Sequence, residues 1–378
     1  MTFDFVSFAA DFTSFYALYL AISLSLNLEF GYAGIPNFGK VLFIAGGAAF
    51  AGSITGRIAA WALGVGKGDF ITNNFATMGQ VNQLLLGDPL LVIALVIIGL
   101  AVAAFVGGVF GYVMSYPAIH LREDYLGLLL LGMAQFFQIF LNTYTPLVGA
   151  TQSILTPDPF YYFSTLNVND LVDVMYAVAM GAFALLVWFY VERTVRSPLG
   201  RVLRAVRDND DASSSLGKDT AKMRRNALIV ASAIGGMAGA MFTFQVAFVG
   251  ASTWTRFAWT FWPFLIVIMG GVANNKGVAL GALFFVLIFK GLQQVQPYIA
   301  PYVFNTNVNF IQDLLFAGLL LAILYLRPQG IVRERSTRTL SSHELDKMVG
   351  PRAGAGAPAS AKEVLGEDNR EGDRAEPA

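Results

Sequence analysis

A polar segment of about 33 residues, 193–225, interrupts an otherwise strongly apolar chain and constrains the fold more than any other feature of the sequence. It carries nine of the 25 Lys and Arg residues, whereas the apolar run that follows it, residues 226–247, carries no charge. A chain patterned in this way places its apolar runs in lipid and leaves the polar segment in water. Segment 193–225 is therefore the part best placed to contact a soluble partner.

The overall composition supports the same division. Hydrophobic residues make up 56% of the 378, charged residues only 13%, and the mean hydropathy is +0.58. These values indicate an integral membrane protein. A net charge of zero gives no reason to expect nucleic acid, and the absence of cysteine excludes disulfides and Cys-based metal sites. The N-terminus lacks the basic stretch of a cleaved signal peptide, so we expect residue 1 to stay in the mature chain.

The apolar runs have the length of membrane spans, because a helix needs roughly 20 apolar residues to cross a hydrocarbon core about 30 Å thick. The sequence thus predicts an all-α integral membrane protein, a bundle of about nine transmembrane helices with one long cytoplasmic loop. The seventh and eighth runs are short and nearly contiguous, so they could instead form one broken or re-entrant element. The expected spans are residues 12–28, 39–63, 89–113, 125–141, 171–192, 226–247, 257–273, 277–294 and 311–326.

The basic residues predict the orientation, since Lys and Arg collect on the cytoplasmic side of membrane proteins. If segment 193–225 is cytoplasmic, then 21 of the 25 basic residues lie inside or in the tail. The opposite orientation would invert this ratio. We therefore expect a multi-pass protein of the cell membrane with the N-terminus outside and the C-terminus inside.

Composition also divides the chain into two parts. Residues 1–332 contain all the apolar runs and form the expected transmembrane domain, with its cytoplasmic loop at 193–225. Residues 333–378 are rich in Gly, Ala, Pro, Glu and Arg, which bury too little apolar area to offset the entropy of ordering. We expect this tail to be disordered.

Few residues suit catalysis or ion coupling. The two histidines, His120 and His343, form no metal-binding motif, and the sequence has no phosphate-binding loop. We expect no enzyme activity and no cofactor, with any ATP hydrolysis on separate chains. Lys290 and Asp313 fall within spans and could couple transport to an ion. The other interpretation of Lys290 is a long side chain reaching toward a membrane interface.

The stretch between the first two spans, residues 27–40, holds three glycines and a proline, so it is not expected to be continuous helix. One interpretation is a simple turn. The other is a helix break whose free backbone groups line a substrate path. Runs of small residues near Gly46, Gly236 and Gly270 allow helix backbones to approach closely elsewhere in the bundle.

Segment 193–225 has a helical pattern of its own. Ser197 and Pro198 predict a helix start, followed by an amphipathic run with basic residues beside an apolar strip. The acidic residues at 208–211 begin a second short helix, which Gly217 ends as a C-cap. A helical pair lying on the membrane surface without a partner is one interpretation. A docking site for a cytoplasmic protein is the other.

These residues resemble the permease subunits of ABC importers for branched-chain amino acids. Residues 197–217 are similar to the family signature that contains its coupling helix, and the resemblance covers roughly residues 20–332. Three further landmarks occur in the family's order: Leu26-Asn27 with Gly31-Tyr32-Ala33-Gly34, then Arg122-Glu123-Asp124-Tyr125-Leu126 with Leu131-Gly132, and finally Arg327-Pro328-Gln329-Gly330.

The chain departs from the family pattern at several positions. Residues 35–40 replace a Gln, a small residue and Gly-His, and Gly271 is followed by Val-Ala-Asn-Asn-Lys in place of a Gly-Ser pattern. Within the cytoplasmic segment, Ser213 and Ser214 replace an expected Ala or acidic residue, and Lys218 takes a position that is usually apolar. The first two departures fall near the expected translocation path, so they bear on the substrate more than on the machinery.

The resemblance implies a transport subunit that works with a second homologous permease chain, two ATP-binding subunits and an extracytoplasmic solute-binding protein. Leucine, isoleucine and valine are the expected solutes, with urea, short amides and other amino acids as alternatives. The residues implied in ATPase coupling are Gly200, Arg201, Arg204, Ala205, Arg207, Asp208, Ala212, Leu216 and Gly217. Those implied in the translocation path are Asn27, Gly31, Tyr32, Gly34, Asn37, Tyr125, Gly270 and Gly271.

A self-contained ion-coupled secondary transporter or channel is the alternative function. In that case the basic loop only anchors the protein, and Lys290 or Asp313 couples an ion.

Overall fold

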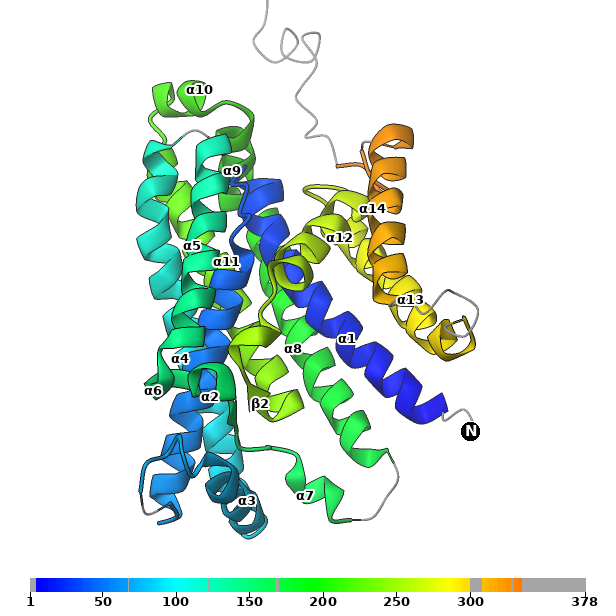
Figure 1. Ribbon diagram of the computed structural model, residues 1–378. Helices are drawn as coiled ribbons and strands as arrows, with labels where there is room; N and C mark the ends of the chain where they lie inside the picture. Colours follow the sequence, from blue (N-terminus) through cyan, green and yellow to red (C-terminus); the bar gives the residue numbers. More distant parts are fainter. Residues whose placement is uncertain are drawn as a thin grey trace, which may run out of the picture. The chain divides into compact units, whose positions relative to one another are not determined.

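Helices predominate in the computed structural model, which describes residues 5–66, 68–121, 123–166, 170–299, 308–327 and 329–334 (Figure 1). The long helices are α1 (Phe5–Leu26), α2 (Lys40–Ala62), α4 (Pro89–His120), α5 (Glu123–Thr143), α8 (Leu171–Arg196), α11 (Thr220–Val246), α13 (Asn275–Ile299) and α14 (Val308–Leu326). The shorter ones are α3 (Asn74–Leu85), α6 (Thr145–Val148), α7 (Tyr161–Ser164), α9 (Pro198–Asp208), α10 (Asp210–Ser215) and α12 (Trp262–Gly270). Two π-helical segments, η1 (Asn27–Tyr32) and η4 (Phe257–Phe261), adjoin α1 and α12.

The helices confirm the prediction of an all-α membrane bundle but not the count of nine spans. Seven helices of the described chain are long and apolar enough to cross a membrane. The spans expected at 257–273 and 311–326 correspond to shorter apolar helices, Phe257–Gly270 and Gln312–Ile323. The seven are Phe5–Tyr32, Lys40–Ala62, Pro89–Pro117, Tyr125–Thr143, Leu171–Arg196, Thr220–Val246 and Asn275–Val295.

The seventh and eighth apolar runs form two separate helices. A turn at 271–274 joins α12 to α13, and Gly271 has a φ of 120° there, a conformation that favours glycine. The two helices then pack side by side. A Cβ on Gly270 would lie 2.3 Å from the carbonyl oxygen of Gly277, so their crossing depends on the missing side chain.

The break between α1 and α2 is shorter than expected. Residues 27–40 are not continuous helix, as predicted, but the interruption is confined to residues 33–39, where Gly34 has a φ of 70°. Helix α1 continues through η1 to Tyr32, because a π-helical turn accommodates Gly31 and widens the helix without ending it.

The centre of the bundle is α11, which packs against α4, α2 and α1. Small residues allow these backbones to approach closely, as the sequence predicted. A Cβ on Gly236 would lie 2.4 Å from the carbonyl oxygen of Ala103 in α4. A Cβ on Gly47 in α2 would lie 2.4 Å from the Cα of Gly236. Helices α2, α4 and α11 therefore meet backbone to backbone.

The connections gather at two ends of the bundle. Helices α9 and α10 lie at one end, and α3, α7 and the N-terminus lie at the other (Figure 1). Between α6 and α7, strand β1 (Ile154–Leu155) pairs antiparallel with β2 (Phe248–Val249). The side chain of Asn74 in α3 both donates to and accepts from the backbone of Leu155, at 3.2 and 2.7 Å. The long connections at 64–88 and 142–170 thus pack together.

The predicted disordered tail, 333–378, lies outside the described residues from 335 onward.

Candidate functional site

The loop between α8 and α11 folds into two short helices, α9 and α10, as the sequence predicted. The hydroxyl oxygen of Ser197 accepts a hydrogen bond from the backbone N–H of Leu199 at 3.2 Å and caps α9. Asn209 caps α10 in the same way, accepting from the backbone of Ala212 at 2.9 Å. Gly217 has a φ of 76° just after α10, which suits a left-handed C-terminal cap.

The predicted coupling residues divide by exposure. Leu216 is the clearest exposed member, because this apolar residue is 80% exposed in the described chain. We call the exposed group the coupling surface, and it comprises Arg201, Ala205, Asp208, Ala212, Leu216 and Gly217.

Gly200 is buried and serves the packing of α9 on α8. A Cβ at this position would lie 2.0 Å from the carbonyl oxygen of Val195. The glycine therefore lets α9 fold back tightly against the end of α8, with Leu203 and Val206 buried on the same side.

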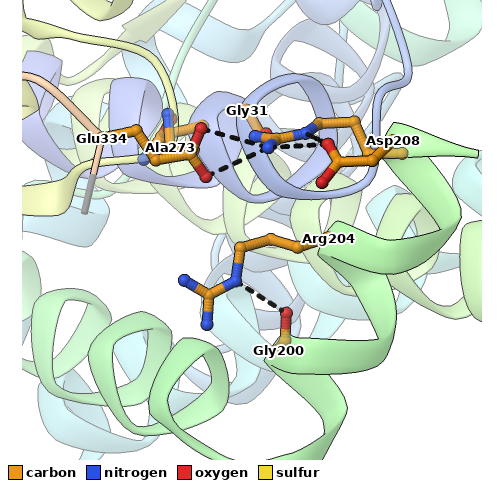
Figure 2. A network of polar contacts seen from close by, with 8 residues as sticks. Gly31, Gly200, Arg204, Asp208, Ala273 and Glu334 are labelled. Carbon is orange, nitrogen blue, oxygen red and sulfur yellow. Dashed lines mark hydrogen bonds and ion pairs between the residues drawn. The ribbon is translucent and has the colours of Figure 1, made fainter. Parts of the chain in front are cut away.

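Arg207 connects α9 to η1 and to the segment 329–334 through a network of polar contacts (Figure 2). Its guanidinium donates to the backbone oxygen of Gly31 in η1 at 2.6 Å. It also donates to both carboxylate oxygens of Glu334 at 3.1 Å and to Asp208 at 2.9 Å. Burial opposes the charged form, but these two carboxylates outweigh it and raise the pKa of Arg207. The guanidinium thus ties α9 to η1 and to the segment 329–334 that follows α14.

Arg204 lies on the same side of α9, half-buried. Its Nε donates to the backbone oxygen of Gly200 at 3.3 Å, a bond drawn in Figure 2. Its guanidinium carbon lies 6.0 Å from the centre of the Tyr32 ring, at the outer limit of a cation–π contact. Two arginines of α9 therefore contact the last turn of η1.

A buried ion pair spans the break between η1 and α2. Lys40 Nζ lies 2.8 Å from Glu29 Oε1, and neither side chain is exposed. Lys40 also donates to the backbone oxygen of Ala231 in α11 at 3.1 Å, and Asn37 Nδ2 donates to Glu29 at 3.1 Å. The spans expected at 12–28 and 39–63 left both charged residues at span ends, because the sequence did not predict that η1 continues the first helix. The one available signal was the opposite charges on either side of the glycine-rich stretch.

Asn27 joins η1 to the turn between α12 and α13. Its Oδ1 accepts from the backbone N–H of Ala273 at 2.9 Å, and its Nδ2 donates to Asn275 at 3.0 Å. Asn275 in turn donates to Glu192 of α8 at 2.7 Å. A Cβ on Gly31 would lie 2.8 Å from the nitrogen of Ala273, so the turn sits directly against η1.

Gly270 and Gly271 pack against the segment 329–334. The backbone N–H groups of Ile331 and Val332 donate to the carbonyls of Met269 and Gly270, at 2.9 and 3.0 Å. A Cβ on Gly271 would lie 2.1 Å from the oxygen of Val332.

The predicted path residues Asn27, Gly31, Tyr32, Gly34 and Asn37 thus lie in η1 or in the break that follows it. The turn that begins after Gly270 rests on η1 through Asn27. Tyr125 lies elsewhere, on α5, with 64% of the residue exposed.

Lys290, considered for ion coupling, is paired with Asp11 and not with Asp313 among the described residues. Lys290 in α13 lies 2.6 Å from the carboxylate of Asp11 in α1 and 4.7 Å from the centre of the Phe15 ring. Asp313 is half-buried on α14. Within the described residues, no group of three or more His, Cys, Asp and Glu side chains could hold a metal ion.

Comparison with known proteins agrees with this architecture. The family model described as branched-chain amino acid transport system / permease component matches residues 8–324. The chain is 36% identical to the probable branched-chain amino acid transport permease protein LivM of Methanocaldococcus jannaschii, over 85% of this chain and 92% of that protein.

The chain is also 26% identical to the high-affinity branched-chain amino acid transport system permease proteins LivM of Salmonella typhimurium and Escherichia coli, over 62% of this chain and 56% of each of theirs. No solved structure gives a significant match. The match over most of its length, together with the apolar helices, shows that this chain belongs to the family of branched-chain amino acid transport system permease components and is a multi-pass membrane protein.

Proposed function

We propose that this chain is the membrane-spanning permease subunit of an ATP-driven ABC importer for leucine, isoleucine and valine. The observation that carries the proposal is the coupling surface, an exposed face of α9 and α10 whose helices are anchored in the bundle through Gly200 and Arg207. The substrate class rests on the relatives, which are named for branched-chain amino acid transport.

The partners we propose are a second homologous permease chain, two ATP-binding subunits on the cytoplasmic side and a solute-binding protein on the outer side. The sequence has no phosphate-binding loop of its own, so ATP hydrolysis falls to the separate subunits. The exposed Leu216 and the small residues around it offer a site where such a subunit could dock.

In the proposed cycle, closure of the ATP-binding subunits pushes on the coupling surface. Because Gly200 holds α9 against α8 and Arg207 holds it against η1, α9 does not move independently of these elements. The movement is therefore transmitted to the helix break and to the turn at 271–274, where we propose that the translocation path lies. The tight contacts of α2, α4 and α11 keep that part of the bundle together as it rocks.

The proposed orientation has the N-terminus outside and the C-terminus in the cytoplasm. Supporting it, α9 and α10 lie at the end of the bundle opposite the N-terminus (Figure 1). Glu334, the last described residue, contacts Arg207 of α9. The basic loop, α9 and the start of the tail thus share one side.

Substitution at Ala212 tests the docking. Ala212 is exposed, so Ala212→Trp adds bulk to the coupling surface and leaves the core of the bundle untouched. We expect leucine uptake to fall at least about tenfold, as for the loss of a central interface contact, with normal insertion into the membrane. The matched control is Lys222→Trp, which places the same ring on an exposed position of α11 outside the coupling surface. Normal uptake by Ala212→Trp would refute docking at this surface.

A further inference from the structure

The ion pair between Glu29 and Lys40 is costly for a purely structural contact. Both side chains are fully buried, and removing two charges from water opposes folding unless their geometry compensates. Well-packed apolar residues usually serve stability as well or better. Ionisable groups inside a membrane protein commonly mark a functional element.

The pair holds three elements together at the break. Glu29 belongs to η1, Lys40 is the first residue of α2, and the second acceptor of the Lys40 ammonium is Ala231 in α11. The backbone N–H of Ile35, inside the break, also donates to the carbonyl of Glu29 at 2.8 Å. Opening the ion pair would therefore separate η1 from the start of α2, where Lys40 also contacts α11.

The same π-helical segment receives Arg207 from the cytoplasmic side. Its acceptor, Gly31, lies only two residues after Glu29 in η1. A Cβ on Gly34, in the break, would lie 3.0 Å from the Arg207 side chain. Polar contacts at Gly31 and Glu29 thus connect η1 to α9 on one side and to α2 on the other, and Lys40 extends the second connection to α11.

The second carboxylate oxygen of Glu29 is free to accept a hydrogen bond in another arrangement of the ion pair. Its Oε2 is buried and has no hydrogen-bond partner among the described residues, whereas Oε1 accepts from both Lys40 and Asn37. Rotation of this carboxylate or a shift of η1 could move one donor to Oε2 without leaving either charge alone. An element with two such arrangements can act as a switch.

We propose that Arg207 and the Glu29–Lys40 pair form a relay that transmits movement of α9 to the helix break. They act as positioning residues for transport, and this inference rests on the proposed function. When α9 moves, Arg207 draws the Gly31 carbonyl and η1 with it, the contact of Lys40 with Oε1 of Glu29 opens, and the separation of η1 from the start of α2 opens the break at residues 33–39. In this relay Arg207 acts on the interior of the permease, in contrast to the exposed residues of the coupling surface.

The absence of cysteine makes the relay directly measurable, because one introduced thiol reports on one position. We choose Ile35→Cys in the break, since Ile35 is buried in this structure. A water-soluble maleimide then labels the position only when the break opens. In the assembled complex we expect labelling to rise roughly tenfold when a non-hydrolysable ATP analogue is bound, a change well within reach of a switch of this kind.

Arg207→Gln in this background tests the transmission step. We expect the ATP-dependent rise in labelling to disappear and uptake to fall roughly tenfold or more, since a hydrogen bond from a charged group is lost. The ATP-binding subunits should still copurify with the variant. The matched control is Lys222→Gln, an exposed cation of the neighbouring helix, which should behave like the parent. A parent-like rise in Arg207→Gln would overturn the relay.

The double variant Glu29→Gln/Lys40→Met tests, in the purified permease alone, whether the Glu29–Lys40 ion pair keeps the break closed. Replacing both charges avoids leaving one of them buried without its partner, so this variant should fold even where Lys40→Met does not. We expect the thiol introduced by Ile35→Cys to be labelled roughly tenfold faster in this variant than in the parent, without any nucleotide. Continued protection of the thiol would contradict the proposal that the ion pair keeps the break closed. This readout needs no partner subunit, so it separates failure of the relay from failure of the proposed importer function.

Discussion

At the residue scale, long cationic side chains bind backbone carbonyls inside this bundle. Arg207 does so at Gly31 and Lys40 does so at Ala231, each from a different helix. Both cations also meet a carboxylate, so their charges are balanced where they lie. Contacts of this kind fix the position of an irregular turn more closely than apolar packing does.

Asn27 gives the residue-scale prediction. Asn27→Leu keeps the approximate size but leaves the backbone N–H of Ala273 and the side chain of Asn275 without their partner. We expect the free energy of unfolding in detergent to fall by about 1–3 kcal/mol. The control is Asn142→Leu, because among the described residues the Asn142 side-chain amide donates only to the backbone oxygen of Gln138 on its own helix. A loss for Asn27→Leu no larger than that of the control would contradict the role of this contact.

Much of the coupling loop could be predicted residue by residue. The cap at Ser197 and the turn at Gly217 are local signals, and local signals can be read from sequence. The contact of Arg207 with Gly31 could not be predicted, because this acceptor lies far away in the chain. The Glu29–Lys40 pair was missed for a similar reason, since its burial depends on the π-helical turn.

At the element scale, the bundle depends on glycines at the positions where its helices cross. Helix α11 contacts α2 and α4 through glycines, and a Cβ on Gly239 would lie 2.1 Å from the backbone oxygen of Ile44. Small-residue runs predicted this close packing. Their sequence could not show which helices would pair, because any two such runs are able to pack together.

Gly236 and Gly108 form a matched pair that tests the packing. Gly236→Ala would place a Cβ 2.4 Å from the oxygen of Ala103, so we expect it to lower the free energy of unfolding by about 1–3 kcal/mol. Gly108→Ala meets its nearest atoms only at 3.8 and 3.9 Å. It should be neutral or stabilising by up to about 1 kcal/mol through helix propensity. Thermal unfolding of both variants in detergent makes the comparison, and equal effects would contradict the packing.

The lengths of the helices were the least predictable property at this scale. Hydropathy located all the apolar runs, but it did not separate a full span from a short helix such as α12. The turn at 271–274 also ends α12 earlier than hydropathy alone suggests, because the backbone of Gly271 adopts a positive φ.

At the scale of the whole molecule, the cytoplasmic loop, the helix break and the segment after α14 converge through one arginine. Arg207 contacts Gly31 and Glu334, so three distant parts of the chain meet beside α9. The exposed coupling surface lies on the same helix pair. This arrangement suits a subunit that receives force from a partner and passes it to its own interior.

The most direct test of the account is purification of the tagged protein from its own membranes in mild detergent, with mass spectrometry of the chains that accompany it. We predict recovery of a second permease chain and of ATP-binding subunits, and loss of the ATP-binding subunits when Ala212, Leu216 and Gly217 of the coupling surface are replaced. A chain that purifies without such partners, and that moves solute into vesicles along an ion gradient without ATP, would contradict the account.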